Sequence, residues 1–330
     1  VGSRWQALKI PNGRMINILV IERPEMNAVT WWRFLRPLSE MQKQNPGRFN
    51  IRMTRRLDEV ELYFVDIVIL SRPNDPDTLS FVRKVKDLGR SKIILDIDDA
   101  ITNLPSYHDQ AAYHNARKGI AWEIFGMVDA FWVSTEQLLY EVGDLARGEI
   151  MPNAVLPEDL PDEPSPDNGL WMWRGKGMQT PDVYFAGVEQ YEQIKDKVKK
   201  WIFWGVLPNI DHLPNVQQLE YETHIPNYFA KVKQMRLNGV WKPLVPCLFN
   251  DAKSNIAWIE ATCSGGVCLT NYAGKTAWEN AVSEMPTYDE AREIWAKSKE
   301  RVLQDFNLID GGNKRAASIE RLLNGSVDRA

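Results

Sequence analysis

A polar run at the start of a predicted helix is well suited to chemistry. Lys253, Ser254 and Asn255 come directly before the apolar residues of that helix. The first backbone N–H groups of a helix lack partners within it, and they lie at the positive end of its dipole. An amine, a hydroxyl and free N–H groups together suit phosphate oxygens, and Glu260 follows about two turns later. An N-capped core helix with a solvated lysine explains the same residues.

A basic turn follows a predicted strand elsewhere in the chain. Residues 170–173 are apolar, and Arg174, Gly175 and Lys176 come directly after them. Two basic loops could together supply donors and positive charge to phosphate oxygens. These residues therefore join the candidate phosphate site.

An acidic cluster ends another predicted strand. Asp96, Asp98 and Asp99 follow the apolar residues of that strand, and His108 and His114 lie further along. A carboxylate here could accept a proton from a hydroxyl or orient that hydroxyl. The cluster could instead hold a metal ion or cap a helix. Each histidine is compatible with a catalytic or a structural role.

The first part of the chain is strongly basic. Residues 1–56 contain eleven lysines and arginines but only three glutamates, a net charge of +8. Trp31, Trp32 and Arg33 lie within this segment, and aromatic rings among basic residues suit a polyanion with bases that can stack. The alternatives are surface charge scattered around a core and an amphipathic helix whose aromatic residues face that core.

The composition excludes several classes of protein. The chain has 330 residues, with 44% hydrophobic and 25% charged residues, which is typical of one or two globular domains. No apolar run reaches the roughly 20 residues that span a bilayer, and the first residues lack a secretion signal. Three cysteines without zinc-ligand spacing favour reduced thiols and a cytoplasmic protein. Residues 1–14 are compatible with a native segment or a cloning remnant.

Apolar runs alternate with helical periodicity and predict an α/β fold. The expected strands are 16–21, 66–70, 92–95, 130–134, 149–151, 170–173, 201–205, 240–244 and 267–270. The expected helices are 78–88, 111–127, 135–142, 181–194, 256–264, 288–306 and 314–323. The predicted division is a first domain (14–155), a proline-rich linker (156–169), a second domain (170–285) and terminal helices (286–330) that can pack back on the first domain.

The order of these motifs resembles the GT-B fold of retaining glycosyltransferases, in which two doubly wound Rossmann-like domains face a cleft. The resemblance is to a branch that includes phage-encoded enzymes that modify DNA bases. It rests on five segments: Asp96-Ile97-Asp98-Asp99, Ser134-Thr135, Pro152-Asn153, Trp173-Arg174-Gly175 with Asp182, and Phe249-Asn250 with Lys253-Ser254-Asn255 and Glu260-Ala261.

The resemblance implies a nucleotide-sugar donor, most simply a UDP-sugar, with no other cofactor and no metal. Glu260 would hold the ribose hydroxyls, and the sugar would be transferred with retention by front-face attack, without an enzymatic nucleophile. Two departures concern the sugar contacts. Ala252 stands where larger relatives carry a first glutamate, and Gln179 stands where branch members often carry histidine.

The acceptor that this resemblance and the basic segment favour is a hydroxymethylated pyrimidine in DNA, modified in the cytoplasm of a phage host. Trp31, Trp32 and Arg33 are the expected acceptor contacts. One alternative is transfer to a lipid-linked or surface polysaccharide, for which no clearly amphipathic membrane-facing helix is present. The other is a non-catalytic module that binds sugar nucleotides. No stable membrane insertion is expected.

Overall fold

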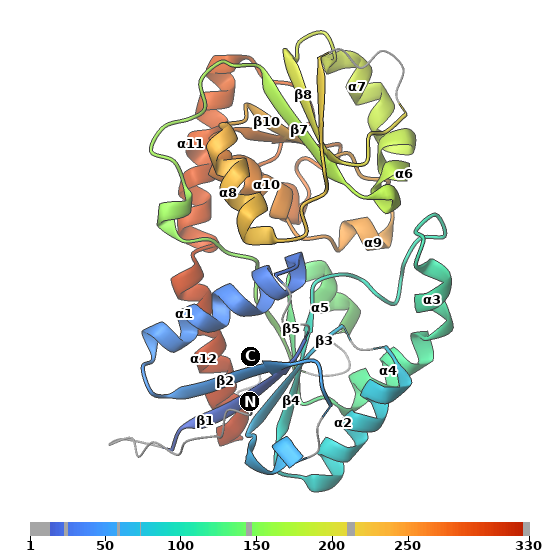
Figure 1. Ribbon diagram of the computed structural model, residues 1–330, viewed down its shortest axis with the longest axis vertical. Coiled ribbons are helices and arrows are strands. Elements are labelled where there is room, and N and C mark those ends of the chain that lie inside the picture. Colours follow the sequence, from blue (N-terminus) through green and yellow to red (C-terminus); the bar gives the residue numbers. More distant parts are fainter. Residues whose placement is uncertain are drawn as a thin grey trace.

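A computed structural model describes residues 14–22, 26–57, 60–72, 74–142, 147–209 and 215–325. Two α/β domains lie one above the other, each built on a parallel sheet (Figure 1). The predicted α/β class with two parallel sheets is confirmed. None of the helices in these residues is long and apolar enough to cross a membrane.

The first sheet has six parallel strands in the order β2-β1-β3-β4-β5-β6. They are β1 (Ile16–Ile21), β2 (Phe49–Thr54), β3 (Ile67–Ser71), β4 (Lys92–Ile97), β5 (Ala130–Val133) and β6 (Arg147–Ile150). The central strands are mostly apolar because helices cover both faces. Their carboxyl ends share one edge, which faces the second domain (Figure 1).

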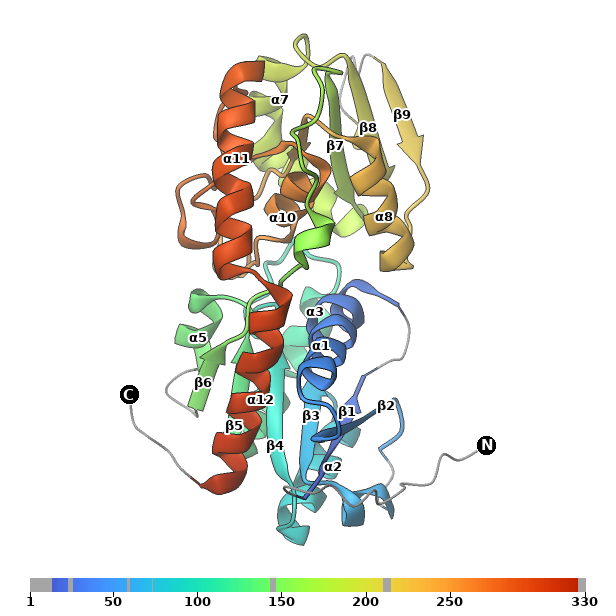
Figure 2. The same ribbon diagram turned by 90° about the vertical axis from the view of Figure 1, so that its left-hand side faces the viewer.

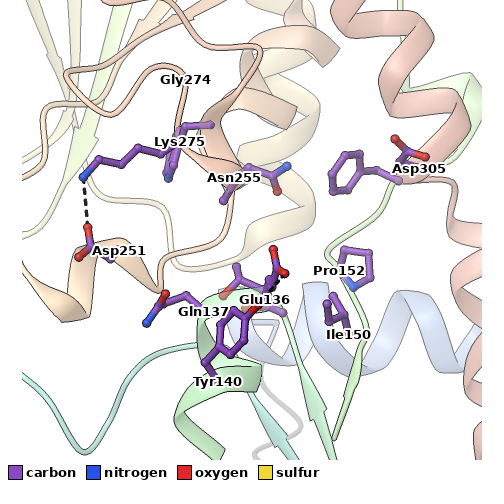
Figure 3. Close-up of a pocket in the computed structure, with 15 residues that line it drawn as sticks. Glu136, Gln137, Tyr140, Ile150, Pro152, Asp251, Asn255, Gly274, Lys275 and Asp305 are labelled. Atoms are coloured by element: carbon purple, nitrogen blue, oxygen red, sulfur yellow. Dashed lines mark hydrogen bonds and ion pairs between the residues drawn. The ribbon is translucent and has the colours of Figure 1, made fainter. Parts of the chain in front are cut away.

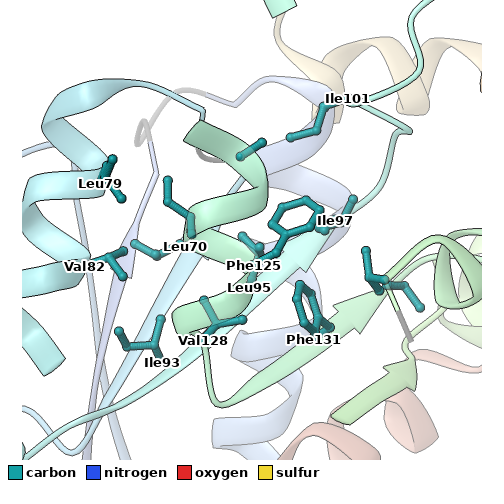
Figure 4. Close-up of a cluster of buried hydrophobic side chains, with 14 of the residues drawn as sticks. Leu70, Leu79, Val82, Ile93, Leu95, Ile97, Ile101, Phe125, Val128 and Phe131 are labelled. Atoms are coloured by element: carbon teal, nitrogen blue, oxygen red, sulfur yellow. The ribbon is translucent and has the colours of Figure 1, made fainter. Parts of the chain in front are cut away.

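Helices on both faces bury this sheet. They are η1 (Thr30–Leu35), α1 (Arg36–Gln44), η2 (Val60–Phe64), α2 (Pro76–Leu88), α3 (Ala111–Ala116), α4 (Lys118–Met127) and α5 (Glu136–Val142). Asp75 caps α2 through the Thr78 amide, and Gly89 ends it with a φ of +62°. Figure 4 shows the core that α2 and α4 form on one face, with Phe125 and Phe131 at its centre.

The second sheet has five parallel strands in the order β11-β10-β7-β8-β9. They are β7 (Leu170–Gly175), β8 (Lys200–Gly205), β9 (Val216–Leu219), β10 (Gly239–Trp241) and β11 (Val267–Leu269). The surrounding helices are η3 (Pro157–Asp159), η4 (Gly177–Gln179), α6 (Thr180–Asp182), η5 (Val183–Gly187), α7 (Val188–Ile194), α8 (Ile225–Met235), α9 (Leu248–Asp251), α10 (Ile256–Ser264), η6 (Thr276–Trp278) and α11 (Tyr288–Asp305). Strands β2 and β9 and helix α8 were not predicted from the sequence, and the expected helix 111–127 is divided into α3 and α4.

The chain passes between the domains twice at one place. The Val155 amide donates to the Phe306 carbonyl, and the Leu308 amide donates to the Val155 carbonyl. Helix α12 (Leu308–Asn324) then returns to the first domain and packs against α1 (Figure 2). Its Ile319 is fully buried in the core of that domain. The first domain is therefore completed by residues distant in sequence.

A buried ion pair lies where the sequence predicted two functional residues. Arg33 donates through Nε and Nη2 to the Asp96 carboxylate at 2.7 and 3.0 Å, and each side chain is 1% exposed. Arg33 also donates to the Met151 carbonyl and to Asn153. Burial raises the pKa of Asp96, and Arg33 opposes that effect. Arg33 and Asp96 are therefore each other's partners in the core, an arrangement that favours structural roles over the expected acceptor contact and catalytic group.

The two tryptophans also belong to the packing between domains. Trp32 is buried and meets Phe229 of α8 edge-to-face, with ring centroids 5.3 Å apart. Trp31 is partly buried against the same cluster, and the Arg36 guanidinium lies 5.4 Å from its ring centroid. Both rings have protein partners, which favours the alternative of aromatic residues that face the core over the expected acceptor contacts.

The predicted basic surface is largely neutralised within the fold. Arg4, Lys9 and Arg23 lie outside the described residues. Of the others, at least four besides Arg33 form ion pairs: Arg14 with Asp66, Arg36 with Asp159, Lys43 with Glu40, and Arg48 with Glu320. A net charge counted along the sequence therefore overstates the positive surface that this segment presents.

Replacing Asp96 with alanine should destabilise the protein by about 3–5 kcal/mol, because the change leaves the Arg33 charge buried without its partner. Urea unfolding followed by circular dichroism measures this free energy. Arg48→Ala, which breaks a half-exposed pair, is the matched control and should cost about 1 kcal/mol or less. Equal effects of the two variants would contradict a buried structural pair.

Candidate active site

A cavity of about 330 Å³ lies between the domains, at the carboxyl ends of both sets of strands. From the first domain it is lined by Ala28, Val29, Arg72, Asp98, Asp99, Tyr107 and His108. From the second it is lined by Arg174, Gln179, Asp182, Val240, Lys242, Phe249, Lys253, Ser254, Ile256, Ala257, Glu260 and Trp278. Most of the predicted donor and catalytic residues thus meet in one cavity.

Arg174 follows β7 and is held by two aromatic rings. Its guanidinium carbon lies 3.9 Å from the ring centroid of Tyr228 and 4.8 Å from that of Tyr221. One terminal nitrogen donates to the Glu222 carbonyl at 3.4 Å, whereas Nε is buried without a partner. The stacking fixes the orientation of the guanidinium, so the free N–H is available to an anion in the cavity.

Glu260, on α10, lies in the same cavity and is 4% exposed. Its Oε2 accepts from the Tyr228 hydroxyl at 2.8 Å, while Oε1 is buried without a partner. Burial raises the pKa of Glu260, and the charge of Arg174 and the hydrogen bond from Tyr228 oppose that effect. Its free carboxylate oxygen can accept a hydrogen bond from a hydroxyl of a bound molecule.

Lys253 is positioned by a network centred on the buried carboxylate of Asp182. Lys253 Nζ lies 3.7 Å from Asp182 Oδ2. Asp182 Oδ1 accepts from Asn250 Nδ2 and from the Val245 amide, both at 2.9 Å. The Tyr107 hydroxyl of the first domain reaches the same oxygen at 3.4 Å. Asp182 therefore links the loop before α10 to both domains.

Lys242 is a cavity residue that the sequence reasoning missed. It follows β10 directly, so the rule that placed Asp98 after β4 could have found it. Burial, and secondarily the positive charge of Lys253, lowers the pKa of Lys242 to about 8. A bound anion would favour the protonated amine at neutral pH.

Arg72, also missed, faces the two acids of the first domain. Its Nε lies 3.1 Å from Asp98 Oδ1, and its Nη1 lies 3.2 Å from Asp99 Oδ2. The Asp98 contact lacks hydrogen-bond geometry, and that oxygen is buried without a hydrogen bond. Burial raises the pKa of Asp98, with Arg72 opposing. Arg72 has a φ of +40°, a strained value for arginine.

The histidines occupy different positions. His108 lines the cavity and meets the Phe249 ring edge-to-face. Its Nδ1 accepts from the Gln110 amide at 3.2 Å, which places the proton of the neutral ring on Nε2. Burial lowers the pKa of His108. His114 contacts Asn74 at 2.7 Å and lines an adjoining cavity of about 480 Å³ instead.

Of the four other predicted donor residues, only Ser254 lines this cavity. Ser254 lines the cavity, whereas Asn255 lines a separate one on the other side of the same loop. Gly175 is required by packing, because a Cβ there would lie 2.3 Å from the Trp173 ring. Lys176 is exposed, lies over the Tyr221 ring and lines the adjoining cavity with His114.

Ala252, one of the departures from the family pattern, has a packing explanation. It is fully buried in the core of the first domain, and its carbonyl accepts from Thr135 Oγ1 at 2.9 Å. A glutamate there would place a carboxylate among apolar side chains. Gln179, the other departure, lines the cavity and accepts from the Lys176 amide.

The cavity can bind an extended anionic ligand. Arg174, Lys242 and Lys253 lie on the side of the second domain, while Asp98 and Asp99 lie on the side of the first. Within the described ranges, no cluster of three or more His, Cys, Asp or Glu side chains could hold a metal ion. The basic side chains of the lining and the start of α10 place positive charge on the side of the second domain.

No family model matches the chain, and no curated protein sequence matches it. Several solved structures do. A glycosyltransferase from Rickettsia africae ESF-5 has a TM-score of 0.56 and 11% identity, over 94% of this chain and 100% of that one. A UDP-forming α,α-trehalose-phosphate synthase from Burkholderia vietnamiensis has a TM-score of 0.56 and 11% identity, over 93% and 97%.

A third similar structure is an α-glucosyltransferase in complex with UDP and a 13-mer DNA containing a HMU base. It has a TM-score of 0.51 and 12% identity, over 93% of this chain and 95% of that one. At such low identity the likeness concerns the arrangement of the two domains. The chain therefore has the α/β fold seen in GT-B glycosyltransferases.

Proposed function

We propose that this protein is a retaining glycosyltransferase that uses a nucleotide-sugar donor. The observation that carries the proposal is one cavity lined by four buried polar atoms without hydrogen-bond partners among the described residues. These atoms are Arg174 Nε, Glu260 Oε1, Asp98 Oδ1 and Trp278 Nε1. Buried polar groups normally have partners, so a bound molecule would supply them. Fold alone does not decide the reaction, so the proposal rests on this site.

The donor would lie along the second domain. Lys253, Ser254 and Arg174 would contact the diphosphate, and Lys242 would add a further positive charge. The free oxygen of Glu260 would accept from the ribose hydroxyls. A UDP-sugar is the preferred donor, which agrees with the UDP bound to one of the similar structures.

The chemical step would take place beside the first domain. Asp98 would orient the acceptor hydroxyl or accept its proton, and Asp99 and Arg72 would set the charge around it. His108, with its proton on Nε2, is a second hydrogen-bond donor beside the reacting groups. Arg174, Lys242 and Lys253 would stabilise the departing diphosphate. Front-face attack would retain configuration without an enzymatic nucleophile.

The acceptor we propose is a hydroxymethylated pyrimidine in DNA. The HMU-containing DNA bound to a similar α-glucosyltransferase supports this choice. A base inside a duplex would have to be flipped out to reach Asp98. The adjoining cavity carries two basic residues, Lys176 and Arg72, against one acid, Glu22, on that side. The first 56 residues contribute less than predicted, since most of their described charges are paired.

Lys253→Ala should weaken binding of UDP-glucose about tenfold, because a charged contact to the diphosphate is lost. Isothermal titration calorimetry measures the dissociation constant. Lys231→Ala removes a lysine that pairs with Glu222 outside the cavity, and it should bind like the unmodified protein. If both variants bind UDP-glucose normally, the donor does not lie on Lys253.

Donor affinity should fall as the pH rises through about 8. Burial lowers the pKa of Lys242 to about 8 in the unliganded protein. Above that pH the site therefore loses a positive charge that would attract the diphosphate. Titrations between pH 6.5 and 9.5 test this dependence. Lys242→Arg remains protonated throughout and should flatten the profile. A profile that is identical in both proteins would exclude Lys242 from donor binding.

Transfer to a duplex that contains hydroxymethylcytosine should occur at low salt and decline steeply as salt rises from 50 to 200 mM, because phosphate contacts release counterions. Radiolabelled sugar incorporated into DNA is the measurement. Asp98→Asn should reduce transfer about 100-fold or more while donor affinity stays unchanged. Asp87→Asn, on the surface, should change neither transfer nor donor affinity.

The same assay separates the alternatives. No transfer to modified DNA at low salt, combined with transfer to a saccharide, would replace the acceptor but keep the glycosyltransferase. Donor binding without turnover on any acceptor or water would favour a sugar-nucleotide-binding module.

A further inference from the structure

A second cavity, of about 620 Å³, lies on the other side of the loop that carries Lys253 and Ser254. Figure 3 shows its lining, with Glu136 and Tyr140 on the side of the first domain and Asn255 and Lys275 on the side of the second. Asp305 lies where the chain passes between the domains. The volume is within the range of small-molecule sites, about 300–1,000 Å³.

A buried polar group in this lining lacks a partner among the described residues. Trp278, which lines both cavities, is 2% exposed, and its indole N–H has no acceptor. Asn255, which is 5% exposed, lies in the same lining. Since buried donors are normally satisfied, the indole N–H points to a ligand.

The charges of the lining do not suit an anion. Lys275, the basic residue of the lining, lies 3.3 Å from Asp251 (dashed in Figure 3). Asp305 pairs with Arg301. Glu136 accepts only from the Tyr140 hydroxyl, at 3.2 Å, among the groups that the structure describes. A phosphate would meet this carboxylate without a free cation, so the cavity selects against charged sugars and DNA.

The same lining suits a neutral saccharide. A carboxylate accepts from two hydroxyls, and an amide both donates and accepts. Aromatic rings pack against the C–H faces of a sugar ring, and the Tyr140 ring is 70% exposed beside Glu136. We propose that this second cavity binds a neutral saccharide, held jointly by the two domains and separate from the donor cavity.

Occupancy of this site would affect the donor cavity through shared residues. Trp278 faces both cavities, and Asn255 is two residues from Lys253 in the same loop. A saccharide that orders this loop would change donor affinity, and the donor would change saccharide affinity by the same factor.

The test is calorimetric titration of the full chain with maltose, trehalose and methyl α-glucoside, with UDP at saturation so that the donor cavity is filled. We expect saturable binding of at least one sugar. Tyr140→Ala and Glu136→Gln should each weaken it about fivefold or more. Tyr63→Ala, which removes a tyrosine of similar exposure, should leave it unchanged. Glucose 6-phosphate should bind at least about tenfold more weakly than methyl α-glucoside.

Absence of saturable binding, unchanged binding in both Tyr140→Ala and Glu136→Gln, or equal binding of glucose 6-phosphate would each overturn the proposal. The result is independent of the proposed function. If UDP itself fails to bind, the nucleotide-sugar assignment fails, while sugar binding that depends on Tyr140 would still establish the second site.

Discussion

The buried pairing of Arg33 with Asp96 holds the acidic side of the cavity in place. It ties the helix after β1 to the end of β4, and through the Met151 carbonyl it reaches the segment after β6. Asp98 lies two residues beyond the paired carboxylate, so its position follows from that anchor. A charge pair removed from water contributes little net stability but strongly penalises any arrangement that separates its partners. Such a constraint suits a site that needs fixed geometry.

Asp182 has a comparable role in the second domain. Its carboxylate receives the Asn250 amide, the Val245 amide and the Tyr107 hydroxyl, and it lies near the Lys253 amine. The geometry of the loop before α10 thus depends on one buried acid as well as on the loop's own backbone. Since Tyr107 belongs to the first domain, the position of Lys253 depends on how the two domains meet.

The strands that were predicted correctly are those whose residues are mostly apolar, because an apolar run indicates a buried strand. Continuous apolar runs such as Ile67–Ser71 predicted strands. The edge strands β2, which mixes polar with apolar residues and is mostly half-buried, and β9, which carries exposed glutamines, were missed. The resemblance based on the order of motifs placed Lys253, Glu260 and Asp98 at one site, and all three line the same cavity. Charge along the chain could not show that Arg33 is buried, because a count of charges does not include their partners. Arg72 and Lys242 were missed because each is a single basic residue after a strand.

The return of α12 to the first domain has a consequence for the order of folding. One face of the first sheet is covered by α1 together with Ile319 and its neighbours on α12. During synthesis from the N-terminus, the sheet is complete by β6, about 160 residues before that helix has been made. Its apolar face would remain partly open until the whole second domain has emerged. The first domain is therefore not an independent folding unit, and its final packing has to follow, or accompany, that of the second.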